Sequence, residues 1–264
     1  MRGKAIYRLA DGVATITLSS PAARNAIDPF MARDLHRCIL QAAEEARVLV
    51  LTGEGSSFCA GANIANVESD LAEIAQSGGK IGAQDVMVEF YDPVVCSLRD
   101  LQIPFVTAVN GPAAGFGASL ALMGDLIFAV EGAYFLQAFR NVGLIPDGGG
   151  TYLLPRMLSR PRAMELVLLG QRLEARKALN WGLINDVFAA DKFNDGCEEV
   201  IGALATGPRS LGLMRRAVWE SFDNSWSEQL GVEARIQSEA VATSDYQEGI
   251  AAFRNKRVPA FEGR

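Results

Sequence analysis

The chain has 264 residues, of which 49% are apolar and 21% charged, and its formal net charge is −6. At roughly 150 residues per domain, this length corresponds to one or two units, and the apolar content excludes a disordered, collagen-like or coiled-coil chain. Acidic residues outnumber basic ones by 31 to 25 without a long basic run, so nucleic-acid binding is not favoured.

The first half of the chain alternates strands and helices. Alternating runs at 5–9 and 13–18 flank Asp11-Gly12 and predict a β-hairpin. Asp28-Pro29 predicts a helix start, with helical spacing as far as Ala46. The further predicted elements are strand 48–51, helix 86–98, strand 105–109, helix 116–123, and strands 126–130 and 133–136. This order predicts an α/β fold.

The second half is predicted to be almost wholly helical from Gly148 onward. The stretch 66–83, which contains Ser77-Gly78-Gly79-Lys80, is predicted to be a mobile loop. We therefore expect one continuous functional domain, with a mixed core over 1–200 and a helical region over 201–264.

The four cysteines have no C-x-x-C spacing, and the N-terminus lacks an apolar signal core, which predicts free thiols and a cytoplasmic location. The single histidine, His36, makes a multi-histidine metal site impossible, and no metal is expected. The uncharged stretch 101–124 is interrupted by proline and glycine, so we expect buried core there and no membrane span.

Two glycine-rich turns beside buried strands are candidates for an anion site. The first, 58–63, follows strand 48–51, and the second, 110–117, leads into a helix whose first N–H groups are unpaired. Two free N–H groups converging from separate turns would form an oxyanion hole. The alternative is that the small residues only permit close packing.

Six blocks of sequence, taken in order, resemble the enoyl-CoA hydratase/isomerase, or crotonase, superfamily. The resemblance within it is strongest to the 2-(1,2-epoxyphenylacetyl)-CoA isomerase and Δ3,Δ2-enoyl-CoA isomerase group. The blocks are 20–26, 58–64, 108–117, 143–151, 178–184 and 248–257.

This resemblance implies the crotonase (ClpP-like) spiral of ββα units with a helical C-terminal trimerisation region, in a homotrimer or a dimer of trimers. It also implies an acyl-CoA thioester as substrate, with no separate cofactor because CoA is part of the substrate. The backbone N–H groups of Ala62 and Phe116 would hold the thioester oxygen.

By position, the resemblance also implies a CoA channel. Arg24 and Lys256 would be partners for the CoA phosphates, although both could equally be solvated surface cations. The channel residues would be Ala22, Arg24, Ala60, Asn63 and Ile64, with Phe253 and Lys256 from the tail or from a neighbouring subunit.

The sequence departs from the family at two positions. Hydratases of the family use two glutamates, whose places are taken here by Ser119 and Phe139, so a hydratase is disfavoured. Asp147 remains as the acid/base of an isomerase that works through an enolate. The alternative is that Asp147 only caps the helix expected near Gly148.

The acyl pocket is expected to include Ser119, Phe139 and Phe90, although each aromatic residue could simply be core. Three other functions stay open: a hydratase that uses Asp147, a non-catalytic acyl-CoA-binding subunit, and a dehalogenase in which Asp147 is the nucleophile.

Overall fold

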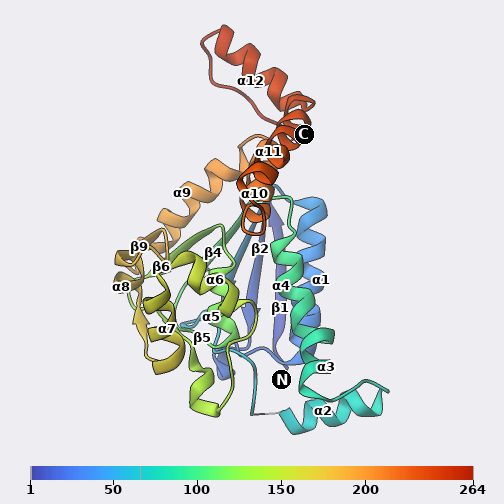
Figure 1. Cartoon of the computed structure of the whole chain (residues 1–264), viewed down its shortest axis with the longest axis vertical. Helices are drawn as coiled ribbons and strands as arrows, with labels where there is room; N and C mark the ends of the chain where they lie inside the picture. Colours follow the sequence, from blue (N-terminus) through green and yellow to red (C-terminus); the bar gives the residue numbers. More distant parts are fainter. Residues whose placement is uncertain (1, 66, 264) are drawn as a thin grey trace.

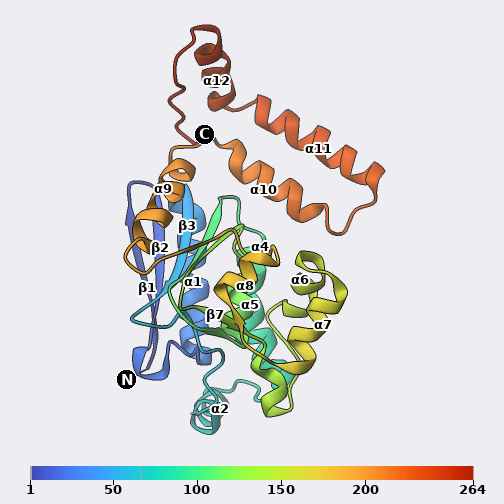
Figure 2. The same ribbon diagram turned by 90° about the vertical axis from the view of Figure 1, so that its left-hand side faces the viewer.

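The computed structural model describes residues 2–65 and 67–263. Figures 1 and 2 show a core of strands and helices from which α10, α11 and α12, coloured orange to red, extend as a helical arm. We call α10–α12 the C-terminal arm. None of the helices in the described residues is long and apolar enough to span a membrane.

The main sheet has six strands in the order β1-β2-β3-β4-β6-β9. β1 and β2 form the predicted antiparallel hairpin, and the other pairs are parallel. Asp11 and Gly12 both have positive φ, as in a two-residue type I′ turn. The backbone twist of this turn matches the right-handed twist of the two strands that it joins. The strands are β1 (Lys4–Ala10), β2 (Val13–Ser19), β3 (Val48–Gly53), β4 (Phe105–Val109), β6 (Leu126–Val130) and β9 (Asp186–Phe188).

The central strands are buried on both faces, which explains their continuous apolar runs. In β3, Leu49 and Leu51 face the core that α1 and α4 cover, whereas Val48 and Val50 face Phe193 of α9. The predicted strands 48–51, 105–109, 126–130 and 133–136 are all confirmed.

A second, smaller sheet has the order β5-β7-β8. Its strands are β5 (Ala113–Ala114), β7 (Tyr134–Leu136) and β8 (Leu173–Glu174). An isolated bridge pairs Cys59 with Ala113, and another pairs Ile27 with Ala62. The segment that follows β3 therefore lies beside the segment that follows β4.

The helices cover the sheets and form the C-terminal arm. α1 begins as predicted, because the Asp28 side chain accepts a hydrogen bond from the Met31 N–H. The helices are α1 (Pro29–Glu45), α2 (Val67–Gln76), α3 (Ala83–Val86), α4 (Asp92–Arg99), α5 (Phe116–Leu122), α6 (Gly150–Met157), α7 (Arg160–Leu169), α8 (Ala175–Asn180), α9 (Phe193–Ala205), α10 (Ser210–Glu220), α11 (Trp226–Val241) and α12 (Ser244–Arg254). Shorter turns are η1 (Pro21–Ala23), the π-helical η2 (Met87–Tyr91) and η3 (Ala138–Val142).

One prediction about secondary structure is wrong. Most of the expected loop 66–83 is helix α2, whose Ile74 is buried in the core, and the helix ends before Gly78, which has positive φ; Asn66 lies outside the described residues. The region after Gly148 is almost wholly helical, as predicted, and β8 and β9 add only two short strands. Strands of two and three residues carry too little periodicity to be recognised.

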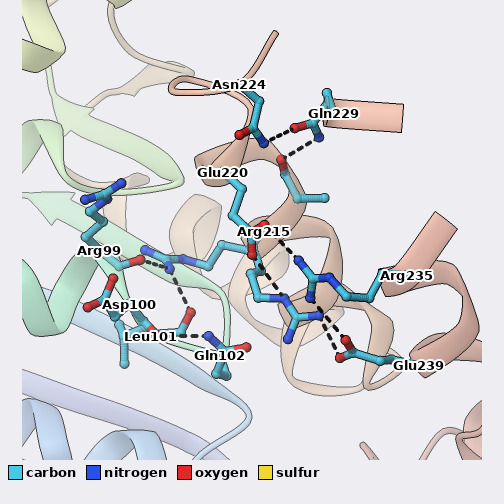
Figure 3. Close-up of polar contacts among 12 residues, drawn as sticks. Arg99, Asp100, Leu101, Gln102, Arg215, Glu220, Asn224, Gln229, Arg235 and Glu239 are labelled. Carbon is cyan, nitrogen blue, oxygen red and sulfur yellow. Dashed lines mark hydrogen bonds and ion pairs between the residues drawn. The ribbon is translucent and has the colours of Figure 1, made fainter. Parts of the chain in front are cut away.

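Arg215 of α10 joins the C-terminal arm to the core. Its guanidinium is buried and donates hydrogen bonds to the carbonyls of Leu98, Arg99 and Leu101, at 2.6, 2.7 and 2.8 Å. Its Nε lies 2.7 Å from the Asp125 carboxylate. Figure 3 shows Arg215 pointing toward Arg99 and Leu101. Carbonyls at a helix C-terminus lack partners within the helix, so Arg215 caps α4.

A close backbone approach accompanies this cap. A Cβ at Gly212 would lie 1.9 Å from the Gln102 carbonyl oxygen, so only glycine lets α10 lie directly on this loop. Trp219 adds a hydrogen bond from its Nε1 to Asp125, at 3.2 Å.

We expect Arg215→Met to lower the free energy of unfolding by about 3 to 5 kcal/mol, because it removes a buried guanidinium and leaves the half-buried Asp125 carboxylate without its ion-pair partner and several carbonyls without their donor. Urea denaturation measures this loss. Arg216→Met is the matched control on the same helix: Arg216 pairs with Glu220 and Glu239 near the surface, and its loss should cost about 1 kcal/mol or less. Equal losses in the two variants would contradict the role given to Arg215.

Candidate active site

The two glycine turns meet at Gly61. Gly61 has φ of +102°, and a Cβ there would lie 2.8 Å from the Ala114 oxygen and 3.4 Å from the Phe116 nitrogen. Any side chain at position 61 would push the turns apart. The predicted convergence of the segments 58–63 and 110–117 is therefore present, and it depends on a missing side chain.

The N–H groups of Ala62 and Phe116 lie outside the local hydrogen-bond ladder. In the bridge to Ala62, the Ile27 N–H donates to the Gly61 oxygen at 2.8 Å and the Ile27 oxygen accepts from the Asn63 N–H at 2.9 Å. This alternation leaves the Ala62 N–H facing away from Ile27. Phe116 begins α5, so its N–H has no acceptor within the helix. Ala62 is exposed, which leaves the junction of the turns open to a ligand.

Asp147 lies next to this junction because its backbone is held against α5. The Ser119 hydroxyl donates to the Asp147 carbonyl at 2.7 Å, and the Gly150 N–H donates to the same oxygen at 3.0 Å. A Cβ at Gly148 would lie 2.8 Å from the Phe116 ring. The segment that carries Asp147 therefore packs directly on the residue that begins α5.

The carboxylate of Asp147 is not used for capping. α6 begins at Gly150, its N-cap is Gly149, and no side chain bonds the helix end. The alternative that Asp147 caps this helix is wrong, because Gly148 and Gly149, both with positive φ, turn the chain between the aspartate and the helix. Oδ1 of Asp147 is buried without a hydrogen-bond partner among the described residues.

Burial raises the pKa of the Asp147 carboxyl to about 6. A hydrogen bond from its own backbone N–H opposes this shift, and the negative charge of Asp92 adds to it. A carboxyl group with this pKa can both accept and return a proton near neutral pH.

Aromatic side chains enclose the junction. The ring of Tyr91 meets that of Phe116 edge to face, with centroids 5.0 Å apart. The Cζ of Phe139 lies 3.9 Å from where a Cβ of Gly115 would be. Phe90, expected in the acyl pocket, is instead stacked under the Arg33 guanidinium of α1, 4.8 Å from it. The structure brings Tyr91, rather than Phe90, to the glycine turns.

The expected CoA-channel residues fall into two groups. The Ala60 N–H donates to the Arg24 oxygen at 2.9 Å, so the exposed segments around them adjoin each other. Phe253 and Lys256, by contrast, lie on or just after α12, at the far end of the C-terminal arm from α5 (Figures 1 and 2). The first group lies on the surface near Ala62 within a single chain. It consists of Ala22, Arg24, Ala60, Asn63 and Ile64.

The buried Asn25 fixes this first group. Its Nδ2 donates to the oxygens of Glu54 and Ser57, and its Oδ1 accepts from the Ser20 N–H. Both Arg24 and Asn25 have positive φ, which the hydrogen bonds of Asn25 stabilise. Sequence reasoning missed Asn25 as an organiser, since its only signal is an asparagine within a turn.

Other chemistry has little support at this junction. Burial raises the pKa of Cys59 to about 12, so the residue carries a thiol and not a nucleophilic thiolate. His36 is half-buried in α1. Over 2–65 and 67–263, no three His, Cys, Asp or Glu side chains are grouped to hold a metal.

A cavity of about 410 Å³ lies elsewhere, between α10 and the core. Its walls include Leu122, Leu153, Met157, Trp219 and Phe222, and it contains none of Ala62, Phe116 and Asp147. Its size is typical of ligand pockets, but its walls are mainly apolar, and the two charged residues among them, Asp125 and Arg215, are paired with each other at 2.7 Å. The unpaired donors and the buried carboxyl, rather than the cavity, locate the candidate active site.

Comparison with known proteins identifies the family of the chain. Residues 8–264 match the family model described as enoyl-CoA hydratase/isomerase. The chain belongs to this enzyme family. The resemblance seen in the six sequence blocks and the expected crotonase fold are both confirmed.

Some relatives are named as isomerases and others as hydratases. The chain is 41% identical to the 1,2-epoxyphenylacetyl-CoA isomerase of Escherichia coli, over 96% of each chain. It is 37% identical to a Rhodobacter capsulatus protein named "probable enoyl-CoA hydratase", over 98% of this chain and 97% of that protein. A solved enoyl-CoA hydratase from Polaromonas superposes with a TM-score of 0.88 at 32% identity, over 98% and 100% of the two chains.

For this member of the hydratase/isomerase family, we expect Gly61→Ala to reduce acyl-CoA turnover by about 100-fold or more, because the added Cβ separates the two N–H donors. Steady-state kinetics measure this loss. Gly78→Ala is the control: Gly78 also has positive φ, but nothing lies within 4 Å of its Cβ position. A similar loss in both variants would attribute the effect to backbone strain.

The raised pKa of Asp147 also predicts a stability effect. Between the unfolded pKa of 3.8 and the folded value of about 6, the native state binds more protons, so this group's contribution to stability falls as pH rises through that window. Asp147→Asn removes the contribution. Relative to wild type, the variant should gain a few degrees in its thermal midpoint on going from pH 4 to pH 8. A difference between variant and wild type that does not change with pH would refute the raised pKa of Asp147.

Proposed function

We propose that the protein is an acyl-CoA isomerase that shifts a double bond, or rearranges a ring or epoxide, through a thioester enolate. The observation that carries this proposal is the half-buried side chain of Asp147, whose Oδ1 is buried without a hydrogen-bond partner among the described residues, on the segment that packs against Phe116 of the donor pair.

In the proposed reaction, the thioester oxygen accepts hydrogen bonds from the N–H groups of Ala62 and Phe116. The Asp147 carboxylate removes a proton from C2 of a 3-enoyl-CoA, and the electron pair of that C–H bond enters a dienolate whose charge rests on the thioester oxygen. Asp147, now protonated, returns the proton to C4, which gives the 2-enoyl isomer. Donors fixed in advance in a site with little water stabilise such a charge strongly.

The absence of a second carboxylate favours isomerisation over hydration. Ser119 uses its hydroxyl to hold the Asp147 carbonyl, and Phe139 is apolar and buried, so neither can position and activate a water. A single acid/base is sufficient for a proton shuttle between two carbons of one substrate.

The proposal extends to the binding of CoA. CoA arrives as part of the substrate, no metal or redox cofactor takes part, and Arg24 meets the CoA phosphates. Because Phe253 and Lys256 lie on the C-terminal arm, their contribution would come from a neighbouring copy in a homotrimer or a dimer of trimers. Exposed apolar side chains on the arm support this assembly: Trp226 is 80% exposed and Phe253 84%.

The free cysteines are compatible with a cytoplasmic location.

The test is to incubate the protein with a 3-enoyl-CoA and, separately, with a 2-enoyl-CoA. The products are separated by chromatography and their molecular masses are measured by mass spectrometry. An isomer of unchanged mass from the 3-enoyl substrate supports the proposal. A product heavier by one water identifies a hydratase, the activity named for the Rhodobacter relative. Binding of both esters without exchange of the C2 proton into heavy water identifies a binding subunit.

We further expect kcat/KM to rise with pH through about 6, because only the ionised Asp147 can remove the proton. Asp147→Asn should lower kcat at least about 1,000-fold while leaving the affinity for a saturated acyl-CoA unchanged. A pH-rate profile and calorimetric titration measure the two effects. Full activity of this variant would exclude Asp147 as the base.

A further inference from the structure

Tyr91 ends an irregular helical turn next to the candidate active site. It is the last residue of η2, where the Asp92 N–H donates to the Met87 oxygen five residues back. Such π-helical turns insert a residue into a helix and are frequent at functional sites. The turn places Tyr91 immediately before α4, with its side chain buried.

The Tyr91 hydroxyl bonds to the peptide that fixes the Ala62 turn. It donates to the Ile27 oxygen at 3.0 Å, and the same oxygen accepts from the Asn63 N–H at 2.9 Å. The Ile27 N–H in turn holds the Gly61 oxygen. Ile27 thus bonds to Gly61 and to Asn63, the residues on either side of Ala62. The position of Ile27 therefore decides where the Ala62 N–H points.

The Tyr91 ring contacts the other donor. Its centroid lies 5.0 Å from that of Phe116, with the ring planes at 80°. Gly148 also packs against the Phe116 ring, which would lie 2.8 Å from a Cβ at position 148. The Phe116 ring therefore contacts both Tyr91 and the segment that carries Asp147.

The environment keeps the hydroxyl protonated. Burial raises the pKa of Tyr91 above its ordinary value, and the charges of Asp28, Asp147 and Asp70 raise it further. A phenol that stays neutral and is already donating to a carbonyl supplies no proton to a substrate. Its contribution must therefore be made through the groups that it holds.

We propose that Tyr91 is a positioning residue that sets both donors of the oxyanion site: its hydroxyl orients the Ala62 N–H through Ile27, and its ring fixes Phe116. The inference rests on the proposed function for the assignment of these two N–H groups. It predicts that Tyr91 controls how strongly the thioester carbonyl is polarised, and has little effect on how tightly the CoA ester binds.

The test uses Tyr91→Phe, which keeps the ring and removes only the hydroxyl. The control is Tyr7→Phe, which removes a hydroxyl that donates to Glu45 at the surface, 3.1 Å away. The probe is butyryl-CoA with ¹³C at the thioester carbonyl, a saturated ester that binds whether or not the protein is an isomerase. The measurements are the ¹³C shift of the bound carbonyl, kcat and KM with a 3-enoyl-CoA, and the thermal midpoint.

For wild type and Tyr7→Phe we expect a downfield shift of the bound carbonyl, which reports polarisation by the two donors. Tyr91→Phe should lose about half of this shift and about tenfold in kcat, with KM within about twofold, because a small displacement of a donor weakens mainly the transition state. Its thermal midpoint should stay within about 4 °C of wild type.

A Tyr91→Phe variant that retains the full ¹³C shift would overturn the inference, even if its thermal midpoint falls. Another outcome would reject the proposed function without deciding the role of Tyr91. A wild-type ¹³C shift without isomerisation would reject the isomerase and leave the role of Tyr91 to be decided by the variant's shift. The lack of any wild-type shift would reject the oxyanion site, and the inference with it.

Discussion

The contact of Gly61 with Ala114 and Phe116 is the constraint on which the candidate active site depends. Two loops that leave neighbouring strands of one sheet are brought together here, and a bridge from Cys59 to Ala113 joins them into the second sheet. Because no side chain separates the loops, the N–H groups of Ala62 and Phe116 belong to one small volume. The packing of Gly148 on Phe116 then brings the segment that carries Asp147 next to one of these two residues.

The ionised carboxyl of Asp147 lowers the stability of the folded chain. Ser119 and Gly150 satisfy the backbone of Asp147 and leave its side chain without a partner on Oδ1. Partial burial makes the ionised carboxyl unfavourable, and the hydrogen bond from its own backbone N–H offsets this only in part, so its pKa is raised to about 6. The same serine is the residue at which the family resemblance leads one to expect a glutamate in a hydratase, and here its hydroxyl holds the backbone of Asp147.

Helix α4 connects this site to the C-terminal arm. Tyr91 directly precedes its first turn, whereas Arg215 of α10 caps carbonyls at its other end. The arm also carries Phe253 and Lys256, which a single chain keeps at a distance from α5 (Figure 2). The helix that supports the aromatic wall of the site is thus the one on which the arm is anchored.

Local patterns in the sequence determined much of the fold: the hairpin at Asp11-Gly12, the N-cap at Asp28, and the buried strands, since each depends on residues close together in the chain. The glycine turns and Asp147 were likewise recognisable, because their residue types are chemically restricted. Only the tertiary structure decided that Asp147 leaves α6 uncapped, that Tyr91 rather than Phe90 reaches Phe116, and that 67–76 is helical. These outcomes depend on how distant segments pack, on φ at Gly148 and Gly149, and on one π-helical turn, none of which a local pattern encodes.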